Sequence, residues 1–140
     1  MEAEALQTKM QERATERLLR SGDWITAEEI ARLGNRSSRN AHALACSWMK
    51  RRLIFSIQHE GLRLYPSYAL DPAAGYTPKA ALRSLIAVLP DGDRAGWRMA
   101  FWFDCPNSYL DGRRPKDCLS GPQDELLIAA RNEAQGIQHG

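Results

Sequence analysis

The fold is decided by residues 24–65, which read WITAEEIARLGNRSSRNAHALACSWMKRRLIFSIQHEGLRLY. Near their start, Thr26 and Glu29 have the spacing of a capping box, in which each side chain bonds the free backbone N–H of the other residue. This spacing predicts a short helix that begins after Thr26. Gly34 is expected to end it, because glycine is the residue that most often closes a helix.

A longer amphipathic helix is predicted to start at Ser37 or Ser38 and to reach about Arg52. At 100° per residue, mostly apolar side chains gather on one side, whereas the opposite side is basic and mostly small. Such a face can enter the major groove of DNA, because small residues permit close approach and basic residues reach base edges or phosphates. An ordinary surface helix fits the same pattern. The first side consists of Ala41, Leu44, Ala45, Trp48 and Arg52, and the opposite side of Arg39, Ala43, Cys46, Ser47 and Lys50.

Two β-prone runs follow, residues 53–58 and 62–65, around the turn His59-Glu60-Gly61. Glycine is available there for the positive φ that a tight hairpin turn requires. Two helices joined by a tight turn and followed by a hairpin have the element order of a winged helix-turn-helix. We therefore predict a mainly α fold with a small β-hairpin, in which a winged helix-turn-helix at residues 21–70 precedes a small helical domain.

Positive charge is concentrated in the same part of the chain. The 140 residues carry a formal net charge of +2, but residues 32–65 hold seven basic residues against one acidic residue, and residues 71–140 hold eight against nine. An anionic partner is one interpretation of the basic stretch, and a solvated basic face is the other. The order of the elements favours DNA.

Double-stranded DNA is therefore the expected ligand of the first half. Arg39 and Asn40 would discriminate between base pairs, whereas Lys50 and Arg51, at the junction of helix and hairpin, would contact phosphates. A homodimer is expected, because one short module contacts few base pairs. The predicted DNA-binding residues are Arg36, Ser38, Arg39, Asn40, Ser47, Lys50, Arg51 and Arg63.

Strong helix formers predict a separate N-terminal helix within residues 1–20. Its apolar stripe is poor, because Leu6 and Met10 are followed on the same side by arginines. The start of this helix is therefore expected either to fray or to be held by a partner.

A turn-rich linker is predicted at residues 71–77, followed by a helical interaction domain at residues 78–140. Thr77-Pro78 has the pattern of an N-cap followed by proline in the first turn, which predicts the start of a helix there. The apolar residues of this helix recur at i, i+3, i+4 and i+7.

The next predicted helix, from about Arg94 to Asp104, is apolar on all sides, and Asp91 or Asp93 can cap it. One aromatic face can fill the core of a small domain, whereas the second needs cover from the hairpin domain or from another chain. A thick intramolecular core and a partner surface therefore remain alternatives. The two faces are Trp97, Ala100 and Phe101, and Met99, Trp102 and Phe103.

Residues 100–119, AFWFDCPNSYLDGRRPKDCL, resemble the toxin-binding domain of Xre/MbcA/ParS-type antitoxins. Members of that family show an aromatic-rich helix, an asparagine, a Leu-x-Gly, a proline and a leucine in this order before a last helix. The likeness covers roughly residues 78–140. The matching positions are Trp102, Asn107, Leu110, Gly112, Pro115 and Leu119.

The resemblance implies the antitoxin of a bacterial type II toxin-antitoxin pair. Its C-terminal domain would cap an NAD-consuming RES-type toxin, and its N-terminal helix-turn-helix would repress the operon. The first half departs from the family, which commonly has an all-helical, phage-repressor-like DNA-binding domain. An adaptor, or a dimerising regulator without a toxin partner, is the alternative. The expected partner-binding residues are Met99, Trp102, Phe103, Asn107, Leu110, Arg113 and Arg114.

The sequence predicts neither an enzyme nor a cofactor. No metal site is predicted, because the spacing of His42 and Cys46 does not demand completion by Cys105 and Cys118. Three cysteines without a Cys-x-x-Cys pair fit a reducing cytoplasm. Neither an export signal nor a membrane-spanning run is expected, because the first residues mix charges and the longest apolar runs are far shorter than about 20 residues.

Overall fold

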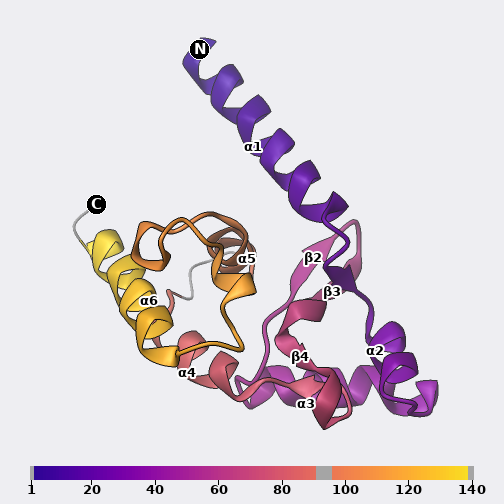
Figure 1. The fold of residues 1–140 in the computed structure, drawn as a ribbon. Coiled ribbons are helices and arrows are strands. Elements are labelled where there is room, and N and C mark those ends of the chain that lie inside the picture. The colour runs from indigo at the N-terminus through magenta and orange to yellow at the C-terminus, as the bar shows by residue number, and fades with distance from the viewer. Residues whose placement is uncertain (1, 91–95, 139–140) are drawn as a thin grey trace.

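The computed structural model describes residues 2–90 and 96–138 of the chain (Figure 1). As predicted, it is mainly helical, with small antiparallel sheets of few strands. The α-helices are α1 (Glu2–Arg20), α2 (Ala27–Leu33), α3 (Ala41–Lys50), α4 (Ala80–Val88), α5 (Trp97–Asp104) and α6 (Gln123–Gln138). The strands are β1 (Trp24–Ile25), β2 (Ile57–His59), β3 (Leu62–Pro66), β4 (Leu70–Asp71) and β5 (Thr77–Pro78). Short 3₁₀ helices are η1 (Ser38–Asn40), η2 (Ser67–Ala69), η3 (Pro72–Ala74), η4 (Ser108–Leu110) and η5 (Pro115–Asp117).

The predicted capping box at the start of α2 is confirmed. The backbone N–H of Glu29 donates to Thr26 Oγ1 at 3.2 Å, and the backbone N–H of Thr26 donates to Glu29 Oε1 at 3.1 Å. The N–H of Gly34 then bonds the carbonyl of Ile30 at 3.0 Å, which closes the helix where the sequence places its end.

The third helix starts later than predicted. Ser37 does act as a cap, but its hydroxyl accepts the N–H of Arg39 at 3.2 Å and opens the 3₁₀ turn η1, and the α-helix begins only at Ala41. Serine and asparagine side chains compete with the backbone for hydrogen bonds, so a polar stretch of this kind favours a turn over a regular helix. At the other end, Arg52 lies at φ 57°, beyond the last helical residue.

The predicted hairpin is confirmed as β2 and β3, which pair antiparallel with His59 opposite Leu62. Glu60 and Gly61 both have positive φ, 51° and 79°, as a two-residue hairpin turn of the primed type requires. Its first strand is shorter than predicted and begins at Ile57, because the preceding residues run into the core. β1 pairs with the other edge of β3, so the strand order is β1-β3-β2.

One hydrophobic core joins the two halves of the chain. Phe103 of α5 stacks on Phe55 with ring centroids 5.4 Å apart and lies 5.6 Å from Tyr68. A polar link lies beside these rings, where Lys116 Nζ donates to Asp23 Oδ2 and to Asp104 Oδ1, each at 2.7 Å. The units predicted at residues 21–70 and 78–140 thus pack on each other rather than standing apart.

The segment predicted as a linker is folded. β4 pairs with β5, with Asp71 opposite Thr77, and the Asp71 carboxylate accepts the N–H of Ala73 at 3.0 Å. The prediction that Thr77-Pro78 starts a helix is therefore wrong, and α4 begins only after Lys79. The sequence signal was ambiguous, since proline is tolerated both in a first helical turn and in an edge strand.

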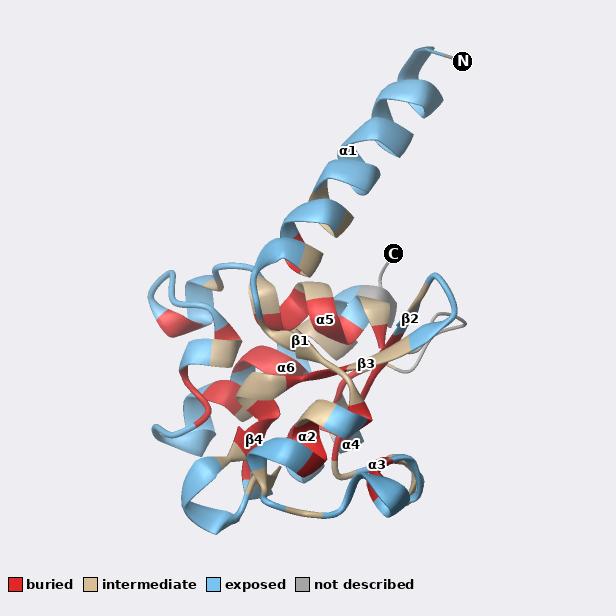
Figure 2. Ribbon diagram, turned by 90° about the vertical axis from the view of Figure 1, so that its right-hand side faces the viewer, coloured by how far each residue is buried: buried red, intermediate tan, exposed pale blue. Residues whose placement is uncertain are grey.

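Helix α1 forms as predicted and projects away from the rest of the molecule (Figures 1 and 2). Its only buried residue is Leu18, near its C-terminal end. The residues that were predicted to cap α5, Asp91 and Asp93, lie outside the described residues, as does the predicted helix start at Arg94. Over the part of the chain described, no helix has both the length and the apolar character that crossing a bilayer requires.

Candidate nucleic-acid interface

Helix α3 turns one edge into the core and leaves the other uncovered. Ala41, Ala45 and Trp48 are buried, with exposed fractions of 5% or less. On the opposite edge Ala43 and Lys50 are exposed and Ser47 is half-buried. Ala43, Ser47 and Lys50 share one face of the helix, because they are spaced by four and then three residues. The small, basic face predicted from the sequence is therefore accessible.

Cations and polar groups lie at both ends of this face. Ser38, Arg39 and Asn40 are exposed in η1, directly before α3, and Lys50 and Arg51 are exposed at its end. Lys50 lies ten positions after Asn40, which corresponds to about 15 Å along the helix axis. Five of the predicted DNA-binding residues are thus exposed at the two ends of α3.

Arg36 does not belong to this surface, contrary to the prediction. Its Nη2 donates to the carbonyl of Gly75 at 2.7 Å, and its guanidinium lies 5.8 Å from the ring centroid of Trp48. The side chain is half-buried and ties the turn between α2 and α3 to the segment between β4 and β5. The Arg36 guanidinium thus interacts within the chain, because it is stabilised both by a hydrogen bond to a carbonyl and by a cation–π contact with an aromatic ring.

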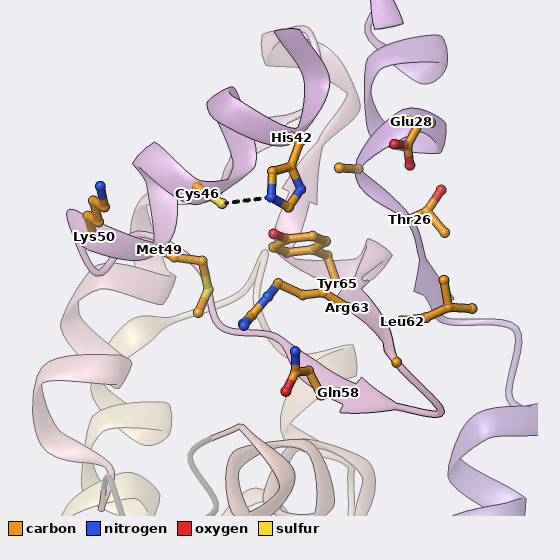
Figure 3. Close-up of a pocket in the computed structure, with 12 residues that line it drawn as sticks. Thr26, Glu28, His42, Cys46, Met49, Lys50, Gln58, Leu62, Arg63 and Tyr65 are labelled. Carbon is orange, nitrogen blue, oxygen red and sulfur yellow. Dashed lines mark hydrogen bonds between the residues drawn. The ribbon is translucent and has the colours of Figure 1, made fainter. Parts of the chain in front are cut away.

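Arg63 of β3 is half-buried, and its Nη1 donates to Ser56 Oγ at 2.8 Å. It lines a hollow of about 580 Å³ between α2, α3 and the hairpin (Figure 3). Lys50 lies on another side of the same hollow and Glu28 opposite. Both predicted cations therefore face a shared recess beside α3.

The recess also contains His42 and Tyr65, which the sequence did not predict to bind DNA, and Cys46, which it placed on the basic side of the helix. His42 and Cys46, one turn apart on α3, point toward each other, with 3.6 Å between Nε2 and Sγ (Figure 3). Tyr65 forms the floor. Burial raises the pKa of Tyr65 above its ordinary value, the nearby Cys46 adds to the rise and Arg63 opposes it, so the phenol stays neutral. The recess forms only where α2, α3 and the hairpin meet, and no sequence spacing links His42 and Cys46 of α3 to the residues of the other two elements.

The prediction that Met99, Trp102, Phe103 and Leu110 bind a partner is corrected by their burial. Their exposed fractions are 4%, 8%, 0% and 1%. The thick intramolecular core, the alternative left open by the sequence, accounts for them, because Leu110 and the face of α5 that carries Met99, Trp102 and Phe103 pack inside the chain.

The other residues predicted to bind a partner make local bonds. Asn107 Oδ1 accepts the N–H of Tyr109 at 2.9 Å and caps η4. Arg113 bonds the carbonyl of Leu110 and the Glu125 carboxylate, and Arg114 Nε donates to the carbonyl of Asp104 at 2.8 Å. Both arginines remain exposed at the surface.

A small apolar surface near these arginines was missed. Tyr109 and Ile128 are 49% and 51% exposed, and the Tyr109 hydroxyl donates to Asn132 Oδ1 at 3.0 Å, one turn of α6 beyond Ile128. Their outward position depends on how η4 packs on α6, which the sequence does not specify.

We compared the chain with models of known protein families, with curated proteins and with solved structures. Nothing matches. Among the residues that the structure describes, no cluster of three or more His, Cys, Asp or Glu side chains is placed to hold a metal ion, and Cys46, Cys105 and Cys118 are free thiols.

Proposed function

We propose that the protein is a cytoplasmic transcriptional regulator that binds double-stranded DNA with a winged helix-turn-helix. The elements α2, α3, β2 and β3 follow in the required order, and the small sheet has the order β1-β3-β2. In this arrangement α3 enters the major groove and the hairpin lies beside the sugar-phosphate backbone.

The single observation that carries the proposal is the uncovered outer face of α3 between cations at both ends. Ala43 and Ser47 leave room for a base-pair edge, and Arg39 and Asn40 lie at the end of the helix from which such proteins contact bases. In this proposal Lys50 and Arg51 neutralise phosphates. No acidic residue occurs between Glu29 and Glu60, so nothing in that stretch offsets this attraction.

Binding to duplex DNA at several salt concentrations tests the proposal. If about five phosphates are neutralised per protomer, the logarithm of the binding constant falls with that of the salt concentration at a slope near −4.5. Fluorescence anisotropy with labelled duplexes measures this slope. A chain that shows no binding even at about 50 mM salt does not fit the proposal.

A second function concerns the last part of the chain. We propose that residues 78–140, which resemble an antitoxin's toxin-binding domain, bind a partner protein of the RES-type toxin class. Since Trp102 and Phe103 of α5 are buried, contact would be made by Tyr109 and Ile128 with Arg113 beside them. Affinity purification after co-expression with such a toxin tests this proposal, with Tyr109→Ala and Ile128→Glu expected to abolish capture. Retained capture by both variants would exclude this surface, and an adaptor for another protein would remain the alternative.

A further inference from the structure

Helix α1 is the least supported element of the fold. It has 19 residues, of which only Leu18 is buried. Leu6 and Met10 are 61% and 62% exposed, among the most exposed large apolar side chains described. In proteins most of the stability of a helix comes from tertiary packing of its apolar side, so a helix that projects in this way needs packing from elsewhere.

A groove of about 1250 Å³ runs between α1 and the body of the protein. Thr8, Thr15 and Leu19 contribute to the α1 wall, and Trp97 and Phe101 of α5 form an aromatic part of the opposite wall. The two aromatic rings are only partly buried, with centroids 6.0 Å apart. The Trp97 indole N–H is held by the carbonyl of Gln58 at 3.2 Å, which fixes this ring against the hairpin.

We infer that helix α1 of a second copy of this chain lies antiparallel in this groove, and that the two copies exchange their α1 helices about a two-fold axis. In this arrangement Leu6 and Met10 of each copy cover Trp97 and Phe101 of the other. The side of α1 that carries Thr8 and Thr15 faces the second α1. One occupant thus covers both the exposed apolar residues of α1 and the open groove, and the contact closes on itself as a dimer.

Charge complementarity favours this occupant and this orientation. Helix α1 is acidic in its first turn, at Glu2 and Glu4, and basic in its last turn, at Arg17 and Arg20. Antiparallel pairing brings the acidic end of one copy beside the basic end of the other, whereas parallel pairing brings like charges together. It also makes the two helix dipoles antiparallel, so that the positive end of each helix lies beside the negative end of the other.

Sedimentation equilibrium of the full chain tests the inference. The wild type is expected to be a dimer, and Leu6→Glu combined with Met10→Glu is expected to raise the dimer dissociation constant at least ~100-fold, because two apolar side chains leave the interface. Both residues are exposed within one chain, so circular dichroism should show the body still folded. Leu33→Glu, which changes a similarly exposed apolar residue at the end of α2, is the matched control and should leave the dimer intact. A wild type that stays monomeric, or a dimer that the double variant does not weaken, overturns the inference.

Disulfide formation tests the orientation. In a background with Cys46→Ser and Cys105→Ser, Gln11→Cys lies near the two-fold axis and should cross-link the two copies on oxidation. Glu2→Cys should not, because antiparallel pairing holds the two first turns about 25 Å apart, given a rise of 1.5 Å per residue. Cross-linking at both positions would indicate a parallel pair and overturn the arrangement. The inference depends on α1 and the groove alone, so loss of DNA binding would leave it intact.

Discussion

Helices α3 and α5 are both predicted from the sequence to present a functional face to a partner, but the structure exposes the predicted face of α3 and buries that of α5. The outer face of α3 carries Ala43, Ser47 and Lys50 and remains accessible. The proposed partner face of α5, with Trp102 and Phe103, lies inside the protein. The side chains on the two predicted faces differ: they are small and basic on α3, and large and aromatic on α5. The regularity of the helical pattern does not distinguish the two helices.

The physical reason for this difference is the free energy that each face gains when it is buried. A buried aromatic side chain removes about 150–250 Å² from water, and a chain of this size needs such residues to offset its conformational entropy. A face of alanine, serine and lysine gains little from burial and would leave an ammonium without water. Side-chain chemistry, more than periodicity, therefore indicates which of two faces stays outside.

The largest expected effect comes from opening the core at α5. Phe103→Ala should lower the free energy of unfolding by about 3–5 kcal/mol, because the ring is fully buried against Phe55 and Tyr68. Arg39→Ala on the exposed surface should change it by less than about 0.5 kcal/mol. Urea unfolding followed by tryptophan fluorescence measures both. Equal losses would remove the contrast between the two helices.

The approach of α5 to the hairpin should be nearly as sensitive. Gly96, directly before α5, has φ 97°, and a Cβ there would collide with the backbone carbonyl of Ser56. Gly96→Ala should therefore cost about 2–4 kcal/mol. Gly112→Ala is the matched control, since Gly112 has φ 82° but open space around it, and should cost only about 1 kcal/mol. Thermal unfolding of both variants separates the collision from the backbone strain.

Local signals in the sequence predict the elements well. The capping box at Thr26, the hairpin turn at Gly61 and the helix ending at Arg20 are all confirmed, because each depends on residues within one or two turns of one another. The misplaced start of α4 at Thr77 was also a local decision. It failed because strand pairing with residues 70–71 outweighed the local preference of proline for a first helical turn.

Side-chain contacts between distant segments could not be predicted in the same way. Arg36 belongs to a basic stretch, yet Gly75, 39 residues later, accepts its hydrogen bond. Likewise, Tyr65 and Cys46 share a recess although nothing in their spacing indicates it. The exposed face of α3 could be predicted because all its residues lie on one helix, where periodicity shows which of them share a side. The recess beside α3 could not be predicted, because it also needs residues of α2 and of the hairpin.

A smaller effect should appear on DNA affinity without a change in stability. The double variant Lys50→Ala, Arg51→Ala should weaken binding to all DNA sequences about 10-fold at 100 mM salt and reduce the salt slope by about 1.8, since two phosphate contacts are lost. Arg36→Ala should leave the slope unchanged and instead lower the unfolding free energy by about 1–2 kcal/mol, because its bond to Gly75 is lost. Anisotropy titrations and urea unfolding of the same samples separate the roles. An unchanged slope in the double variant would show that the two residues contact no phosphate.

The smallest effect at neutral pH should come from the aromatic contact between the halves. The Tyr68 hydroxyl is buried and has no hydrogen-bond partner among the described residues, so Tyr68→Phe should change stability by less than about 1 kcal/mol at pH 7. Burial raises the pKa of Tyr68 well above 10.0, with further contributions from Asp23 and Asp104. The native state therefore keeps this proton while the unfolded chain loses it above about pH 10, so its contribution is complete below that pH and declines as pH rises. Wild type should lose up to ~1.4 kcal/mol more per pH unit than Tyr68→Phe between about pH 10 and 11. Parallel urea titrations at these pH values measure the difference, and coinciding curves would mean that water reaches the hydroxyl in the native state.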